Sequence, residues 1–258
     1  FHRAHAEFVG AMCAAGTLGA NAYGYPSLQV KLLASLLCGI WLLVNRTDGQ
    51  ATDYPLIHLK YKLLLVLEAL FLLDLFLLWN YFAGLTPDVI TSCCGVLFGD
   101  GNGSLAAELA HLPPAAMRVV YLVSVYLLFR VGIHFIITRR GAVVCALTGI
   151  WLTWVSLSSI LSFISLYFYQ MPSHHCPFCI LQREYGYVGY PLYLSWLTLG
   201  VFSAGIWVLE RFRSIPSLEQ IVPAAQRQYC MISLAAGGVF LLISVYPMIF
   251  KSFRLGGY

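Results

Sequence analysis

The stretch YKLLLVLEALFLLDLFLLWNYF, residues 61–82, decides the class of fold of this chain. It can cross a bilayer as one helix, since a span needs roughly 20 mostly apolar residues. The whole chain has the same character, because 60% of its residues are hydrophobic and only 10% are charged. Soluble domains carry about 25% charged residues. The sequence therefore predicts an all-α, polytopic membrane protein.

Further segments of similar composition lie on both sides of this stretch. Together with 61–82, the predicted spans are 6–22, 28–44, 116–137, 142–168, 187–209 and 230–249, about seven transmembrane helices in all. The first is the weakest, because small residues dominate it, and such helices pack against other helices. Segments 6–22 and 28–44 could instead form one broken unit.

Lysine and arginine residues set the predicted orientation, since they collect in cytoplasmic loops of membrane proteins. With seven spans, nine of them lie on one side and four on the other. The nine are Arg3, Arg46, Lys60, Lys62, Arg139, Arg140, Arg211, Arg213 and Arg227. The four are Arg118, Arg183, Lys251 and Arg254. We expect an inner (cytoplasmic) membrane location with a cytoplasmic N-terminus, an external C-terminus, and external, periplasmic loops at 83–115 and 169–186.

Four cysteines fall in those external loops: Cys93 and Cys94 in the first, Cys176 and Cys179 in the second. The second pair is part of HHCPFCILQR, residues 174–183. At the start of a helix, backbone N–H groups and the helix dipole would lower the pKa of such a thiol. Arg183 follows Cys179 by four residues, a spacing that puts both on one face of a helix. The pattern predicts a redox-active pair; a structural disulfide or a buried thiol pair is the alternative.

The motif CPFCILQR, residues 176–183, resembles the signature of the bacterial disulfide-bond formation protein B family. The order of the parts resembles the vitamin K epoxide reductase family more closely. In that family an external loop with two cysteines precedes two helices and then a Cys-x-x-Cys helix. Two features depart from both families: Cys93 and Cys94 are adjacent, and extra spans flank the matching region.

This resemblance implies a four-helix redox bundle made of 61–82, 116–137, 142–168 and 187–209. It divides the chain into N-terminal membrane helices (1–60), the bundle with its external cysteine loops (61–209), and a cytoplasmic loop with the last helix (210–258). It further implies a quinone-coupled thiol–disulfide oxidoreductase. Its catalytic residues would be Cys176, Cys179, Cys93 and Cys94, with Arg183 beside the quinone (ubiquinone or menaquinone). A thioredoxin-like external thiol protein would exchange electrons with Cys93 and Cys94.

Two other readings of the same residues stay open. His174 and His175 with Cys176 and Cys179 could hold a metal ion, because imidazole and thiolate ligands suit copper(I) or zinc. The chain could also be a non-catalytic membrane subunit of a larger respiratory or redox complex, with other membrane subunits as partners. No nucleotide motif appears and no nucleic-acid partner is expected.

Charged residues inside the predicted spans require partners, because an unpaired charge in hydrocarbon is costly. Glu68 and Asp74 lie in 61–82, while Arg130 and His134 lie four residues apart in 116–137. The depths of Glu68 and Arg130 agree, so we expect these two to form an ion pair. Cys145 and Cys230 lie on different spans and are expected to be small buried hydrophobic residues.

Overall fold

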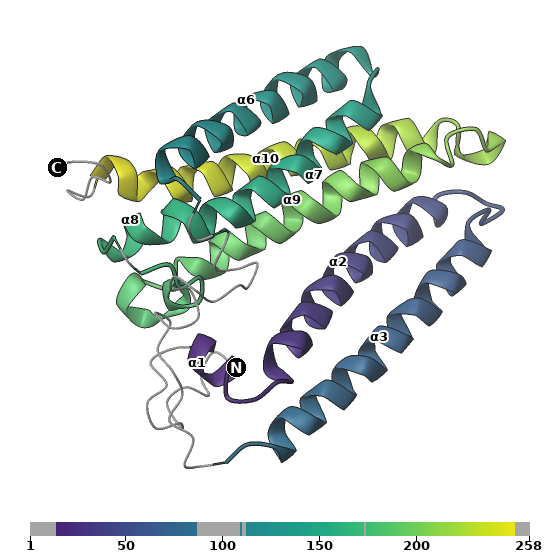
Figure 1. Ribbon diagram of the computed structural model, residues 1–258. Helices are drawn as coiled ribbons and strands as arrows, with labels where there is room; N and C mark the ends of the chain where they lie inside the picture. Colours follow the sequence, from purple (N-terminus) through teal and green to yellow (C-terminus); the bar gives the residue numbers. More distant parts are fainter. Residues whose placement is uncertain (1–13, 87–108, 110–111, 173, 251–258) are drawn as a thin grey trace.

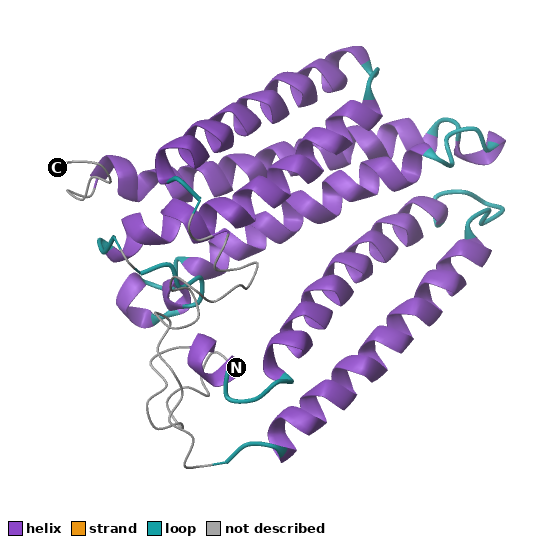
Figure 2. Cartoon of the chain, in the orientation of Figure 1, coloured by secondary structure: helices purple, strands orange, loops and turns teal. Residues whose placement is uncertain are grey.

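A computed structural model describes residues 14–86, 109, 112–172 and 174–250, and the described chain is all-helical (Figure 2). Six of its helices are long and apolar enough to cross a membrane. They are α2 (Gly24–Asp48), α3 (Ile57–Ala83), α6 (Pro114–Thr138), the continuous helix that begins with α7 (Ala142–Ser159), α9 (Gly189–Glu210) and α10 (Ile221–Phe250). The prediction of an all-α polytopic membrane protein is therefore confirmed.

Shorter elements complete the described chain. They are α1 (Ala14–Leu18), the π-helix η2 (Ile160–Ile164), α8 (Ser165–Tyr169), and the 3-10 turns η3 (Cys179–Leu181), η4 (Arg183–Tyr185) and η5 (Pro216–Leu218). The π-helix continues α7 directly into α8, so one rod runs from Ala142 to Tyr169. Such π-turns inside α-helices occur frequently at functional sites.

The predicted first span, 6–22, does not extend as far as expected. Its described part is helical only to Leu18 and then turns before α2 begins at Gly24. The rest of that segment lies outside the described residues. The described chain thus has six candidate spans where the sequence predicted about seven.

The helices form two groups in Figure 1. In the larger group α9 packs along α10 and α7, and α6 covers α7 and α10. In the smaller group α2 and α3 form a hairpin, and α2 joins it to the larger group through α9. The predicted bundle was therefore wrong in one member: α10 packs with α6, α7 and α9, whereas α3 packs chiefly on α2.

Small residues bring the helix axes close together at the contacts between helices. A Cβ added at Gly149 of α7 would lie 2.1 Å from Ser203 Oγ of α9. One added at Gly205 of α9 would lie 2.4 Å from Leu43 Cδ1 of α2. Membrane helices rely on such close approach, because lipid tails are as apolar as leucine and burial alone gives little drive for association.

The outer faces of the helices are apolar, as expected for helices surrounded by hydrocarbon. In α3, only Leu67 and Tyr81 are buried, while side chains such as Leu65, Phe71 and Trp79 are exposed. An apolar surface of this extent would be a liability in water. The surface therefore supports the assignment of these helices to a membrane.

The charges within the spans do not pair as predicted. Glu68 and Arg130 are both exposed, and no ion pair among the described residues includes either one. Figure 1 shows why: α3 and α6 lie at opposite sides of the molecule, with other helices between them. Instead Lys31 of α2 forms an ion pair with Asp74 of α3, which also accepts a hydrogen bond from Ser27 Oγ at 2.8 Å.

Two ends of the molecule can be distinguished. The basic end carries the turns 49–56, 139–141 and 211–220, and the cysteine end carries the segment 170–188 between α8 and α9 (Figure 1). Arg46, Lys60, Arg139, Arg140 and Arg211 lie close to the first of these ends. The names describe position only, and the side of the membrane that each end faces stays a prediction.

Candidate functional site

The Cys-x-x-Cys motif lies at the cysteine end, in irregular backbone between two long helices. The segment 170–188 leaves α8 through Gln170 at φ +57° and reaches α9 through Gly186 and Tyr187, also at positive φ. Between these points the described backbone makes the short turns η3 and η4. Since left-handed backbone is uncommon for residues other than glycine, this segment is a defined turn structure rather than a continued helix.

Three potential ligand or redox groups converge in this segment. The Cys176 sulfur, the Cys179 sulfur and a ring nitrogen of His174 all lie within 4.8 Å of one another. His174 Nε2 is 3.3 Å from Cys179 Sγ. The side chains of both cysteines are buried. We call His174, Cys176 and Cys179 the thiol–imidazole cluster.

Two tyrosines from the flanking helices hold the motif in place. Tyr169, the last residue of α8, donates its hydroxyl hydrogen to the Cys176 carbonyl at 2.5 Å and accepts the Ile180 N–H at 2.8 Å. Tyr193 of α9 donates to the Pro177 carbonyl at 2.5 Å. Backbone groups that leave regular helix need such partners when buried. The motif is thus fixed from both sides by groups outside it.

The π-helix supplies a further anchor. His175 Nδ1 is 2.8 Å from the carbonyl oxygen of Leu161, which lies within η2. A carbonyl can only accept, so Nδ1 of His175 carries the hydrogen. His175 is therefore oriented by the irregular turn of the α7–α8 rod, and the structure does not place it in the thiol–imidazole cluster. A metal site with both histidines as ligands is not what this geometry favours.

Aromatic rings close the cluster from one side. The Tyr169 ring contacts the His174 ring edge-to-face at a centroid distance of 4.5 Å, and the Tyr185 ring at 4.8 Å. Partial burial raises the pKa of the Tyr185 phenol above its ordinary value, and negative charge on Cys179, Glu184 and Cys176 would raise that pKa further. The Tyr185 hydroxyl therefore stays protonated at neutral pH.

The predicted helix through Cys179 and Arg183 is wrong. The 3-10 turn from Cys179 ends at Leu181, and Gln182 is extended, with φ −80° and ψ 162°. Arg183 then begins a separate short turn with its side chain exposed. The spacing of four does not place the two residues on one helix face, because no helix runs through Gln182. The motif also precedes α9 by several residues, so it is not at the N-terminus of a long helix.

The remaining predicted site residues are two cysteines of the first loop and Arg183. Cys93 and Cys94 lie outside the described residues. Their proposed exchange with Cys176 and Cys179 therefore stays a prediction, as does the role of Arg183 beside a quinone.

Two tyrosines that hold the motif, Tyr169 and Tyr193, were not predicted from the sequence. Tyr193 follows Cys179 by fourteen residues and Tyr169 precedes Cys176 by seven, and no spacing rule links either one to the motif.

A second thiol pair, also missed, lies toward the basic end. Cys145 of α7 and Cys230 of α10 have their sulfurs 3.2 Å apart, and Cys230 Sγ lies 3.7 Å from the Gly132 carbonyl oxygen of α6. Both are buried. Only the packing of α7 against α10 brings these residues together, since they are 85 positions apart.

Comparison of the chain with protein families, with curated proteins and with solved structures gives no match.

Proposed function

We propose that the thiol–imidazole cluster is a thiol–disulfide redox centre that exchanges electrons with a membrane quinone. The observation that carries this proposal is the proximity of the two thiols to each other and of His174 Nε2 to Cys179 Sγ. A disulfide needs its two sulfurs at about 2.05 Å, and two residues between cysteines allow that approach with small side-chain rotations. His174 is positioned to accept the proton of the Cys179 thiol. Loss of that proton would leave the thiolate, which is the reactive form.

The proposed reaction balances as a two-electron oxidation. The two thiols of Cys176 and Cys179 lose two protons and two electrons and form one disulfide bond. The quinone gains the same two electrons and two protons and becomes quinol. A reduced thiol protein outside the membrane then restores the dithiol by exchange and is itself oxidised. In the full proposal Cys93 and Cys94 pass the electrons from that thioredoxin-like partner.

The surroundings of the cluster support access from the lipid. Met171, Tyr187 and Tyr190 are exposed large side chains on the same segment or at the start of α9. Tyrosines of this kind are enriched where a membrane meets water, which is also where a quinone headgroup can reside. Arg183 is exposed in the same region, and it would meet a quinone oxygen from outside the cluster rather than from a shared helix face.

The test is turnover by the purified protein with a short-chain quinone and a reduced thioredoxin-like protein. Quinol formation is expected for the unaltered chain and not for Cys176→Ser or Cys179→Ser. Cys38→Ser is the matched control, because Cys38 is a partly exposed thiol on α2 away from the cluster. Equal turnover by Cys179→Ser and the unaltered protein would refute the proposal.

A metal centre is the second candidate, favoured by one specific observation. The ligand atoms of His174, Cys176 and Cys179 already lie within 4.8 Å of one another, a spacing that a single ion could bridge. Two thiolates and one imidazole suit copper(I) or zinc. Elemental analysis after incubation with each metal separates the candidates. Stoichiometric metal lost on His174→Gln, together with no quinol formation, would favour the metal centre.

A further inference from the structure

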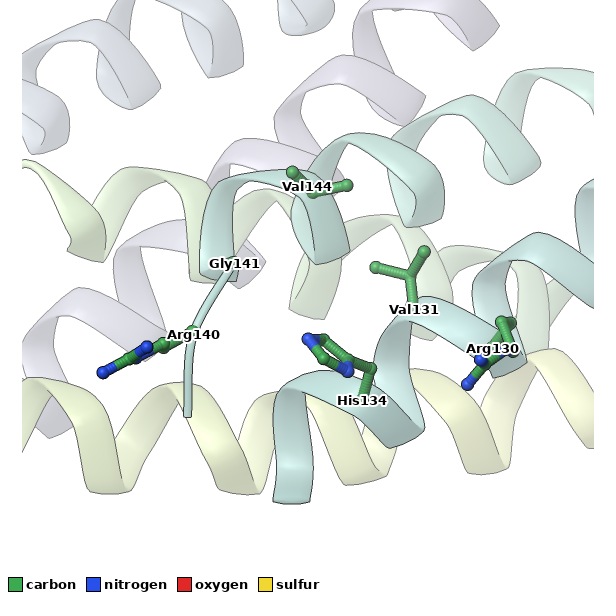
Figure 3. A pocket seen from close by; sticks show the side chains of 6 residues that line it. All are labelled: Arg130, Val131, His134, Arg140, Gly141 and Val144. Carbon is green, nitrogen blue, oxygen red and sulfur yellow. The ribbon is translucent and has the colours of Figure 1, made fainter. Parts of the chain in front are cut away.

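A basic hollow lies at the other end of the molecule from the thiol–imidazole cluster, between the end of α6 and the start of α7. Its volume is about 470 Å³, and it is lined by Arg130, Val131, His134, Arg140, Gly141 and Val144. In the view of Figure 3 the His134 ring lies between the side chains of Arg130 and Arg140. We call this hollow the basic pocket.

The local backbone explains why these side chains line one hollow. Arg130 and His134 are four residues apart on α6 and therefore share one face of that helix. The helix ends at Thr138, Arg139 takes a left-handed conformation at φ +55°, and Gly141 follows at φ +85°. Glycine adopts that conformation without strain. This tight turn places Arg140 beside the end of α6, where it lines the hollow with His134 and Val144; in Figure 3 its side chain extends away from the His134 ring.

The charges in the basic pocket are not compensated by the described chain. No acidic residue lines the pocket. The side chains of Arg130, His134 and Arg140 make no hydrogen bond or ion pair with any residue in 14–86, 109, 112–172 or 174–250. By contrast, Lys31 and Lys60 of the α2–α3 hairpin each have a carboxylate partner, Asp74 and Asp48.

The depth of the pocket makes this imbalance significant. Arg130 lies eight residues before the end of α6, about 12 Å along the axis. The helix has 25 residues, about 37 Å, and so exceeds the roughly 30 Å hydrocarbon core by a few ångströms at each end. The Cα of Arg130 is thus about 8 Å inside the hydrocarbon core, a depth from which its long side chain can reach headgroup level. An arginine there is stabilised by an anion at headgroup level.

We infer that the basic pocket binds the phosphate group of an anionic phospholipid from the leaflet at the basic end. Guanidinium groups recognise phosphate with paired N–H donors, which favours arginine over lysine for this task. Val131 and Val144 give the lining an apolar part, which suits the first part of an acyl chain. Phosphate and chain together fit a lipid better than a soluble ion, which would use the polar half of the hollow only.

The test uses the purified full chain, stripped of lipid in a zwitterionic detergent. Native mass spectrometry would count bound phosphatidylglycerol, phosphatidylcholine of the same acyl chains, or inorganic phosphate. We expect phosphatidylglycerol to bind in preference to the other two, with an affinity that falls as salt is raised. Each arginine removed should weaken binding about 5-fold, so the double variant Arg130→Gln/Arg140→Gln should lose about 25-fold.

Arg139→Gln is the matched control, because it removes the same charge one residue from Arg140 but does not line the pocket. An unchanged affinity in that variant is expected. Equal loss in Arg139→Gln and Arg140→Gln, or equal binding of the two lipids, would overturn the inference. Binding of inorganic phosphate with the same dependence on Arg130 would reject a lipid as the occupant. The lipid and salt comparisons use the unaltered chain, so the inference remains testable if the double variant does not fold.

Discussion

The described part of the chain contains two close pairs of buried cysteines, and the difference between them separates a candidate reactive site from packing. Cys176 and Cys179 lie in irregular backbone at the cysteine end, with a histidine ring nitrogen 3.3 Å from one sulfur. Cys145 and Cys230 lie within the regular helices α7 and α10, with their sulfurs 3.2 Å apart. The sulfurs are close in both pairs, at 3.2 Å in the second and within 4.8 Å in the first. The neighbouring imidazole and the local backbone distinguish the first pair from the second.

Backbone geometry gives the first pair a freedom that the second lacks. Two residues in one turn can rotate toward each other, whereas closing Cys145 to Cys230 draws together two helices already packed around them. The contacts also differ in kind. Among the described residues the polar contacts of Cys230 Sγ are with the Cys145 sulfur and a backbone carbonyl, while the first pair is held by tyrosines and faces His174. This comparison leads to four predictions.

The largest effect is expected for Cys179→Ser. Serine keeps the size of the side chain but is far less ionised than a thiol near neutral pH, so quinol formation should fall to the level without protein. Cys230→Ser should leave the rate within about twofold, because that pair takes no part in the proposed reaction. Steady-state quinone reduction by both variants checks the comparison. A loss of rate in Cys230→Ser equal to that in Cys179→Ser would remove the distinction between the pairs.

Tyr169→Phe should have the next largest effect, on stability. The change leaves the Cys176 carbonyl and the Ile180 N–H without their partner, at a cost of about 1–3 kcal/mol for each buried group. Tyr193→Phe removes one such bond and should cost less. Thermal unfolding of the two variants in the same detergent gives the order. A smaller loss for Tyr169→Phe than for Tyr193→Phe would contradict the role given to Tyr169.

Cys145→Ala should lower stability by about 1 kcal/mol. The variant loses the packing of one sulfur and its contact with Cys230, which is the typical scale for a single buried substitution. The thiol–imidazole cluster lies in another part of the fold, so its reactivity toward a small alkylating reagent should stay the same. Measuring unfolding and alkylation of Cys176 and Cys179 on one sample tests both parts. A changed alkylation rate would show that the two pairs are coupled.

The smallest effect concerns the phenol of Tyr185. Because its pKa is raised, the protonated form is favoured in the folded state, and this contribution to stability is present below the ordinary tyrosine pKa and lost as pH rises through the raised value. Replacing Cys176 and Cys179 by serine removes the neighbouring thiolates and should move the Tyr185 pKa back toward its ordinary range. Tyrosinate absorbance during alkaline titration, with Tyr185→Phe as the reference, measures this shift. Cys145→Ser should not produce it.

The positions of the long helices could be predicted well from the sequence, because local composition alone decides where an apolar span begins and ends. The predicted span 116–137 became Pro114–Thr138, and 142–168 became the rod from Ala142 to Tyr169. Proline 114 suits the first turn of α6, where no N–H is needed, and Gly141 permits the turn before α7. Such signals are local, so they can be read without knowing which helices are neighbours.

The candidate site was predicted less completely. The motif identified Cys176 and Cys179 and the adjacent His174, and the structure brings these three together. The helix expected through Arg183 failed because helical spacing was assumed across Gln182, whose backbone is extended. The predicted pairing of Glu68 with Arg130 was wrong because it was based on depth in the membrane alone. Depth follows from the sequence, but rotation about the helix axis and the choice of neighbour do not.

The sequence by itself determined that lipid surrounds most of the chain, because 60% of its residues are hydrophobic and only 10% are charged. In lipid the backbone must satisfy its own hydrogen bonds, and the helices do so. What only the tertiary structure decided is which helices touch. It placed α10 rather than α3 beside α6, α7 and α9, brought the sulfurs of Cys145 and Cys230 into contact, and placed Arg130, His134 and Arg140 around one hollow. The physical reason is that one apolar helix surface is nearly equivalent to another in lipid. Neighbours are chosen by close fit at small residues such as Gly149 and Gly205, a property of paired surfaces that no single segment carries.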